Sequence, residues 1–199
     1  TTHMVNKVKT AAIIGLDAYE ITVEIDVINS IPGISIVGLP DASINEARDR
    51  VRSAIKNSTY TFPAKKVVIN LAPADIKKVG AHFDLPIAVG ILTEECTIDS
   101  EKIKDYAFLG ELSLDGEIRG VSGVLPLVLG LKNFGIKNVF VPDVNVNEAA
   151  LCEGINVFGA KHLTEVVNHF IENPIKQTKV DKLKLLINNV CKEYKFTAI

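Results

Sequence analysis

The chain has 199 residues, of which 47% are hydrophobic, so it can form one domain with a sizeable core but is too short for two well-buried domains. Its 22 Lys and Arg residues are balanced by 24 Asp and Glu residues, which excludes a basic field over the whole surface and restricts any nucleic-acid contact to a local patch. Three distant cysteines without a CxxC pair exclude a disulfide framework and a cysteine-based zinc site. No apolar run is long enough to cross a bilayer. Together these features predict a cytoplasmic protein without a membrane segment.

Three strands are predicted before the first helix. Val8–Ile14 and Tyr19–Ile28 form a hairpin, because the connection that begins at Gly15 has the length of a turn. Apolar and polar residues alternate strictly in the second segment, which is typical of a strand with one face exposed to water. A short third strand, Ile34–Val37, follows Pro32-Gly33.

The first helix is predicted over Ala42–Lys56. Ser43 stands three residues before Glu46, a spacing that predicts a capping box overlapping with a cap at Asp41. Apolar residues recur with the helical period, so one stripe faces the core. Basic residues occupy the other faces, either as a solvated surface balanced by acidic neighbours, which is the commoner case, or as a phosphate-binding patch: Arg48, Arg50, Arg52 and Lys56.

The stretch Lys65–Leu92 is the predicted centre of the fold. Its β-branched run Val67–Leu71 predicts a strand that is buried on both faces. A loop then leads to an apolar helix, Leu85–Glu94, with Asp84 as its predicted N-cap. A strand, loop and helix in this order often place a functional group over the free backbone N–H groups of the helix start.

His82 is the one unusual side chain in that loop. No Ser, Thr or Cys occurs between Pro63 and Leu92, so no nucleophile accompanies it there, and no second metal ligand is nearby. We therefore interpret His82 as a loop or packing residue and not as a catalytic residue.

The second half of the sequence alternates between strands and helices, as expected for an α/β domain. Asp115-Gly116 is the strongest hairpin signal in the chain, and Gly135 is a predicted C-terminal helix cap. The predicted strands are Phe108–Leu114, Glu117–Val121, Ile136–Val141 and Asn156–Phe158, and the predicted helices are Gly123–Phe134, Val146–Leu151 and Leu163–Glu172.

The tail after Pro174 has a different pattern. Its apolar residues fall on one face of a predicted helix, opposite several lysines, so we expect it to dock on this domain or on a neighbouring copy. The residues of this face are Val180, Leu183, Leu186, Ile187, Val190 and Tyr194.

Three segments carry a resemblance to a known family: GLPDASINEARDRVRSAI, VVINLAPADIKKVGAHFDLPIAVGIL and FLGELSLDGEIRGVSGVLPLVLGLKNFGIKNVFVP. In order and spacing they resemble the N-terminal domain of the magnesium-chelatase-like AAA+ ATPases of the ComM/YifB type. The resemblance implies a Lon-protease or ribosomal-protein domain 2-like fold of the α/β (α+β) class, with a mixed sheet covered by helices. It places this domain at residues 4–173, with 174–199 as a helical tail or linker before an AAA+ module. Residues 1–3 precede Met4 and are interpreted from the sequence as an expression scar.

The resemblance also implies positions for the Ser-Lys dyad of Lon-type proteases. The serine position falls on His82 or Phe83 and the lysine position near Leu125, so neither partner of the dyad is present. Lys132 lies two turns further along the predicted helix, and Ser122 precedes that helix without a paired amine.

The function implied is that of a non-catalytic N-terminal domain, used for assembly and DNA engagement by a hexameric motor such as a branch-migration helicase. The chain contains no GxxxxGK[ST] motif, so ATP and Mg²⁺ are expected in the AAA+ module, and the expected partners are that module, neighbouring subunits and DNA. The alternatives are an active serine peptidase that uses Ser122, and a module that binds a protein or metallocofactor partner. The residues predicted to contact nucleic acid or a partner are Lys77, Lys78, His82, Arg48 and Arg52.

Overall fold

The structure, a computed structural model, describes residues 5–171, 174–181, 183 and 186. Its strands are β1 (Asn6–Ile14), β2 (Asp17–Ile28), β3 (Gly33–Val37), β4 (Lys66–Ala72), β5 (Tyr106–Phe108), β6 (Glu111–Leu112), β7 (Ile118–Arg119), β8 (Asn138–Pro142) and β9 (Asn156–Ala160). Its helices are α1 (Asp41–Asn57), α2 (Asp84–Glu94), α3 (Val124–Asn133), α4 (Val146–Ala149) and α5 (Leu163–Ile171), with short 3₁₀ turns η1 (Ser100–Ile103) and η2 (Asp143–Asn145).

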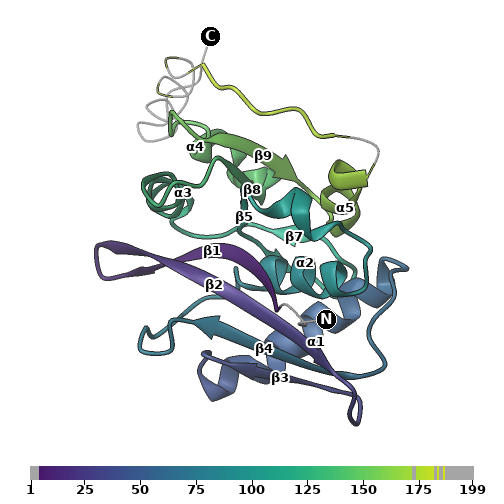
Figure 1. The fold of residues 1–199 in the computed structure, drawn as a ribbon. Helices are drawn as coiled ribbons and strands as arrows, with labels where there is room; N and C mark the ends of the chain where they lie inside the picture. The colour runs from purple at the N-terminus through teal and green to yellow at the C-terminus, as the bar shows by residue number, and fades with distance from the viewer. Residues whose placement is uncertain (1–4, 172–173, 182, 184–185, 187–199) are drawn as a thin grey trace.

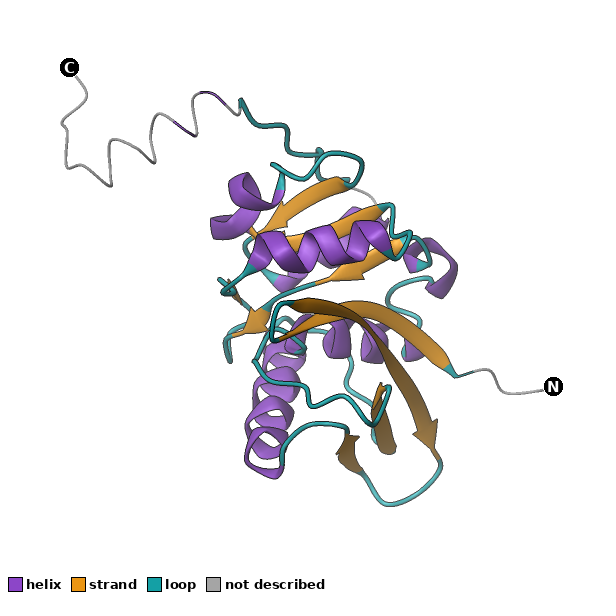
Figure 2. Ribbon diagram, turned by 90° about the vertical axis from the view of Figure 1, so that its left-hand side faces the viewer, coloured by secondary structure: helices purple, strands orange, loops and turns teal. Residues whose placement is uncertain are grey.

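Seven strands form one mixed sheet in the order β3-β4-β2-β1-β5-β8-β9, and β6 and β7 form a separate small hairpin. β2 is antiparallel to both of its neighbours, β1 and β4, whereas the pairs β3–β4, β1–β5, β5–β8 and β8–β9 are parallel. β1 and β5 are paired at a single position, Lys9 with Ala107. The sheet is therefore weakly joined in the middle, and β1 and β2 form a long, strongly curved pair (Figure 2).

Helices cover both faces of the sheet unequally. α1, α2 and α5 pack with the larger core on one face, and α3 and α4 pack with a smaller core over β1, β5, β8 and β9 on the other (Figure 1). This arrangement confirms the predicted α/β fold with a mixed sheet covered by helices. In the part of the chain that the structure describes, no helix combines the length and apolar character needed to cross a membrane.

Two predicted features of the central stretch are wrong. β4 is buried on one face only, because alternate side chains such as Val68 and Asn70 are half-buried on the face that α3 and α4 leave open. Asp84 does not cap α2: the residue at the N-cap is Phe83, and Asp84 is the first helical residue, with its carboxylate bound elsewhere. The predicted hairpin and the α3 boundaries are confirmed within one or two residues.

The capping box predicted for the first helix is also wrong. Pro40 is at the N-cap of α1 and no side chain caps the helix, while the Ser43 amide donates to the Pro40 carbonyl. Glu46 instead lies beside Arg50. The predicted strand Phe108–Leu114 is divided into β5 and β6, since Leu109 and Gly110 between them belong to neither strand.

The residues after Pro174 agree only in part with the predicted docked helix. Residues 174–181 have no helical structure, and the Thr178 amide donates to the Val157 carbonyl of β9. Leu183 and Leu186 are helical, as predicted, but their side chains are exposed. The other members of the predicted apolar face, Ile187, Val190 and Tyr194, lie outside the described residues, as do residues 1–3.

Candidate functional site

A hollow of about 310 Å³ lies where the resemblance places the Lon-type active site. It is formed by the end of β1, the loop before α2, the start of β6 and the loop before α3. Its lining residues are Ile13, Val79, Gly80, Ala81, His82, Glu111, Gly120, Val121, Ser122 and Leu127. Loops from distant parts of the sequence thus meet at one place on the surface.

Backbone bonds fix the loop that carries His82. The Gly110 amide donates to the His82 carbonyl, and the Leu85 amide donates to the Gly110 carbonyl. The amide of Asp84 donates to Ala81. The first amides of α2 are therefore occupied, and the predicted set of free N–H groups at this helix start is not observed.

The His82 ring is anchored to β1. Its Nε2 lies 2.8 Å from the Ala11 carbonyl oxygen, which can only accept, so Nε2 carries the proton and donates. Burial lowers the pKa of His82, and the bond to Ala11 opposes this shift. Gly80 has φ +117, and a Cβ there would lie 2.9 Å from the His82 Nδ1, so glycine lets the loop close over the ring. This geometry agrees with the interpretation of His82 as a packing residue.

The other groups around the hollow do not form a Ser-Lys dyad. Ser122 is exposed and Glu111 is half-buried, and no lysine is among the described residues that line the hollow. Leu125 packs against the smaller core. The side chain of Lys132 runs beside Gly154 instead of toward the hollow.

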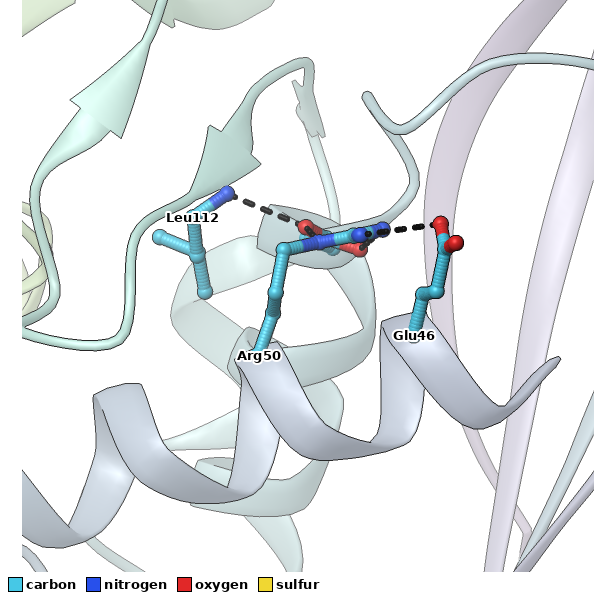
Figure 3. A network of polar contacts seen from close by, with 4 residues as sticks. Glu46, Arg50 and Leu112 are labelled. Atoms are coloured by element: carbon cyan, nitrogen blue, oxygen red, sulfur yellow. Dashed lines mark hydrogen bonds and ion pairs between the residues drawn. The ribbon is translucent and has the colours of Figure 1, made fainter. Parts of the chain in front are cut away.

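A buried ion pair lies next to this site, between α1 and the start of α2 (Figure 3). Arg50 contacts both carboxylate oxygens of Asp84, with Nε 2.6 Å from Oδ2 and Nη2 3.2 Å from Oδ1. The Leu112 amide of β6 donates to the same Oδ2 at 3.1 Å, and Glu46 lies 3.6 Å from the guanidinium. Three elements are thus joined through one carboxylate.

Burial dominates the electrostatics of this pair. The Asp84 side chain is 1% exposed, and its burial raises the pKa to about 6, although hydrogen bonding and charge from Arg50 act in the opposite direction. Hydrogen bonding to Asp84 raises the pKa of Arg50, so the guanidinium stays charged. The sequence pattern assigns Arg50 to the basic face of the first helix and does not reveal its ion pair with Asp84. The signal that could have found the pair is a lone acidic residue at the entrance of an otherwise apolar helix.

Comparison with known proteins identifies the family. Residues 23–145, more than half of the chain, match the family described as subunit ChlI of Mg-chelatase. The chain belongs to this family. It is 41% identical over 160 residues to the competence protein ComM of Haemophilus influenzae, an alignment that covers 80% of this chain and 31% of that protein. It is 42% identical over 175 residues to the YifB protein of Salmonella typhimurium, covering 85% of this chain and 34% of the relative.

A weaker similarity extends to Lon proteases. The archaeal Lon protease of Methanocaldococcus jannaschii is 26% identical over 103 residues, which cover 52% of this chain and 16% of that protein. This similarity agrees with the predicted Lon-like fold. The chain spans about a third of the length of the ComM and YifB relatives that it matches.

The basic residues predicted to contact nucleic acid lie on two elements of this ComM/YifB-type domain, α1 and the loop after β4. β3 and β4 are parallel, and α1 begins just after the C-terminal end of β3. The loop after β4, which carries Lys77, therefore lies at the same end of these strands as the start of α1. Arg52 lies about three turns along α1, and its guanidinium is 5.7 Å from the Phe62 ring centroid. Arg48 is half-buried, whereas Lys77 and Arg52 are exposed.

Lys78 must be removed from the predicted contact set. Its side chain is fully buried under its own loop, and Nζ donates to the carbonyls of Pro73 at 2.5 Å and Ile76 at 2.9 Å. Burial lowers its pKa, and Asp75 opposes the shift. The ammonium group therefore closes the loop and is not available to a phosphate.

Among the described residues, no group of three or more His, Cys, Asp or Glu side chains is arranged to hold a metal ion. Cys96 is exposed and Cys152 is buried, and Cys191 lies outside the described part of the chain.

Proposed function

We propose that this chain is the non-peptidase N-terminal domain of a ComM/YifB-type AAA+ ATPase. It serves assembly and DNA engagement in a cytoplasmic hexameric motor, such as a branch-migration helicase. ATP and Mg²⁺ are bound by the AAA+ module, which together with neighbouring subunits is the partner of this domain. The family membership and the name of the relative ComM, a competence protein, support this proposal.

The observation that carries the proposal is the occupancy of the two dyad positions. A Ser-Lys dyad needs a hydroxyl within hydrogen-bond reach of a desolvated amine. The serine position falls on His82, whose ring is bonded to the Ala11 carbonyl, or on the buried Phe83. The lysine position falls near Leu125, which packs against the smaller core. Lys78 is a buried lysine four residues before His82, and its ammonium group is held by two carbonyls of its own loop. The geometry supports a peptidase scaffold that is used without peptide hydrolysis.

A serine-directed fluorophosphonate tests this conclusion. We expect no labelling of the wild-type protein at concentrations that label an active serine peptidase. The second candidate function, an active serine peptidase, is favoured by one observation: Ser122 shares the hollow with His82 and Glu111. Labelling that is lost in Ser122→Ala and kept in the matched control Ser30→Ala, which alters another exposed serine, would overturn the non-peptidase assignment.

DNA binding is tested by its dependence on salt. Each phosphate contact contributes about 0.9 to the slope of log affinity against log salt concentration. We expect weak, steeply salt-dependent binding, with a smaller slope in Lys77→Ala and in Arg52→Ala. Lys137→Ala, which removes an exposed lysine outside the predicted set, is the control and should keep the full slope. A flat salt response in the wild-type protein would contradict the proposed DNA contact.

Assembly is tested in the full-length protein. Light scattering after size-exclusion chromatography, with and without ATP, should give a hexamer that forms less readily when this domain is deleted. Unchanged assembly of the deleted protein would assign oligomerisation to the AAA+ module alone.

A further inference from the structure

The segment 174–181, called the strap below, follows α5 and passes along the outer edge of β9 (Figure 1). The Thr178 amide donates to the Val157 carbonyl of β9 at 2.9 Å, and Ile175 packs against the larger core. β9 is the last strand of the sheet, so the strap covers an edge whose backbone groups would otherwise face water.

His169 of α5 holds the beginning of the strap. The Ile175 amide donates to Nδ1 at 2.8 Å, and the Tyr106 hydroxyl lies 3.0 Å from Nε2. A backbone N–H can only donate, so Nδ1 must be unprotonated in this arrangement. The neutral ring then carries its proton on Nε2 and donates it to the Tyr106 oxygen. Both ring nitrogens are used, and the tautomer is determined by the strap.

The surroundings of the His169 ring disfavour a second proton. Four aromatic rings pack around it with centroid distances of 4.9 to 5.7 Å, those of Tyr106, Phe140, Phe158 and Phe170. Burial is the cause that lowers the pKa of His169.

Several charged or titratable groups lie on the elements around this ring. η1 carries Lys102, whose Nζ donates to the Phe170 carbonyl at 2.9 Å. Asp105 precedes β5 and, after burial, is the second cause that raises the pKa of Tyr106. Glu165 lies one turn earlier on α5, where it accepts from the Lys161 amide, and Lys176 lies in the strap.

We propose that neutral His169 is a latch that holds the strap on β9, and that protonation of Nδ1 releases it. A protonated ring presents N–H groups at both nitrogens, so Nδ1–H would point at the Ile175 N–H and neither group could accept. Once the strap leaves, backbone groups at the edge of β9 face water.

The test is a pH titration of the 199-residue protein by ¹⁵N NMR, from pH 7.5 down to pH 5. We expect the amide signals of Ile175 and Thr178 to move toward unstructured positions with the same apparent pKa as the His169 ring. Ile175→Pro removes the N–H donor, so by linkage it should raise the His169 pKa, by one unit for each tenfold weakening of strap docking.

Two variants separate the latch from a general effect of acid. In His169→Gln the side-chain oxygen can accept from Ile175 at every pH, so the strap signals should stay docked throughout the titration. His162→Gln is the matched control, because His162 also accepts an amide through Nδ1, from Thr164, and it should keep the wild-type response. The proposal would be overturned if the strap amide signals did not change as His169 titrates. It would also be overturned if these signals still moved with pH in His169→Gln.

Discussion

Replacing Asp84 with asparagine tests whether burial or the Arg50 ion pair controls the energy of this carboxyl group. Burial raises the pKa of Asp84 from 3.8 to about 6 despite its contact with Arg50. Between these two pH values the folded state holds a proton that the unfolded state has lost. The contribution of Asp84 to stability is therefore fully present below pH 3.8 and is lost as the pH rises through about 6.

The magnitude follows from the shift. A difference of about 2 pKa units corresponds to about 3 kcal/mol of unfolding free energy. Asparagine has the shape of the neutral acid and cannot ionise. We expect the unfolding free energy of the wild-type protein, minus that of Asp84→Asn, to fall by about 3 kcal/mol between about pH 4 and pH 7.5.

Chemical denaturation at a series of pH values measures this difference. His82 and His169 have lowered pKa values and contribute the opposite slope, but they are present in both proteins and cancel in the subtraction. Asp49→Asn, which changes an exposed carboxylate on the same helix as Arg50, is the control and should keep the wild-type pH profile. A difference that rises with pH would show that the ion pair outweighs burial, and a flat difference would show that Asp84 is not perturbed; either result refutes the reasoning.

Two further substitutions have expected effects on stability. Gly116→Ala should lower the unfolding free energy by about 1 to 3 kcal/mol, because φ is +92 and a Cβ would lie 2.6 Å from the Ser58 Oγ. Gly33→Ala is the control, because a Cβ at Gly33 meets nothing within 4 Å. It should change the unfolding free energy by less than about 1 kcal/mol in the same denaturation experiment. Lys78→Ala should lower it by about 1 to 3 kcal/mol, because two carbonyls lose their donor. Lys77→Ala, on the exposed neighbour, should stay within about 0.5 kcal/mol, and equal effects of the two lysine variants would contradict the buried position of Lys78.

Local patterns were sufficient for most of the fold. The turn-length connection at Gly15 and the alternation of apolar and polar residues in the second strand predicted the β1–β2 hairpin. An apolar segment ended by a glycine cap at Gly135 predicted α3. These features depend on residues that are close in the sequence, so they can be read without knowing the tertiary structure. The errors were also local: short polar side chains at Ser43 and Asp84 have the chemistry of helix caps, but neither caps a helix here.

What the sequence by itself determined is the family, the absence of a Ser-Lys pair at the dyad positions and the order of the secondary structure, because these depend on residue identity and spacing. The tertiary structure decided which charged groups are available. Lys77 and Lys78 are neighbours in the chain, yet Lys77 faces solvent and Lys78 is enclosed by carbonyls. Arg50, predicted on a basic helix face, instead pairs with Asp84, 34 residues away. Burial and pairing arise from contacts between distant segments, and the free energy of a charged group depends on those contacts more than on its neighbours in sequence.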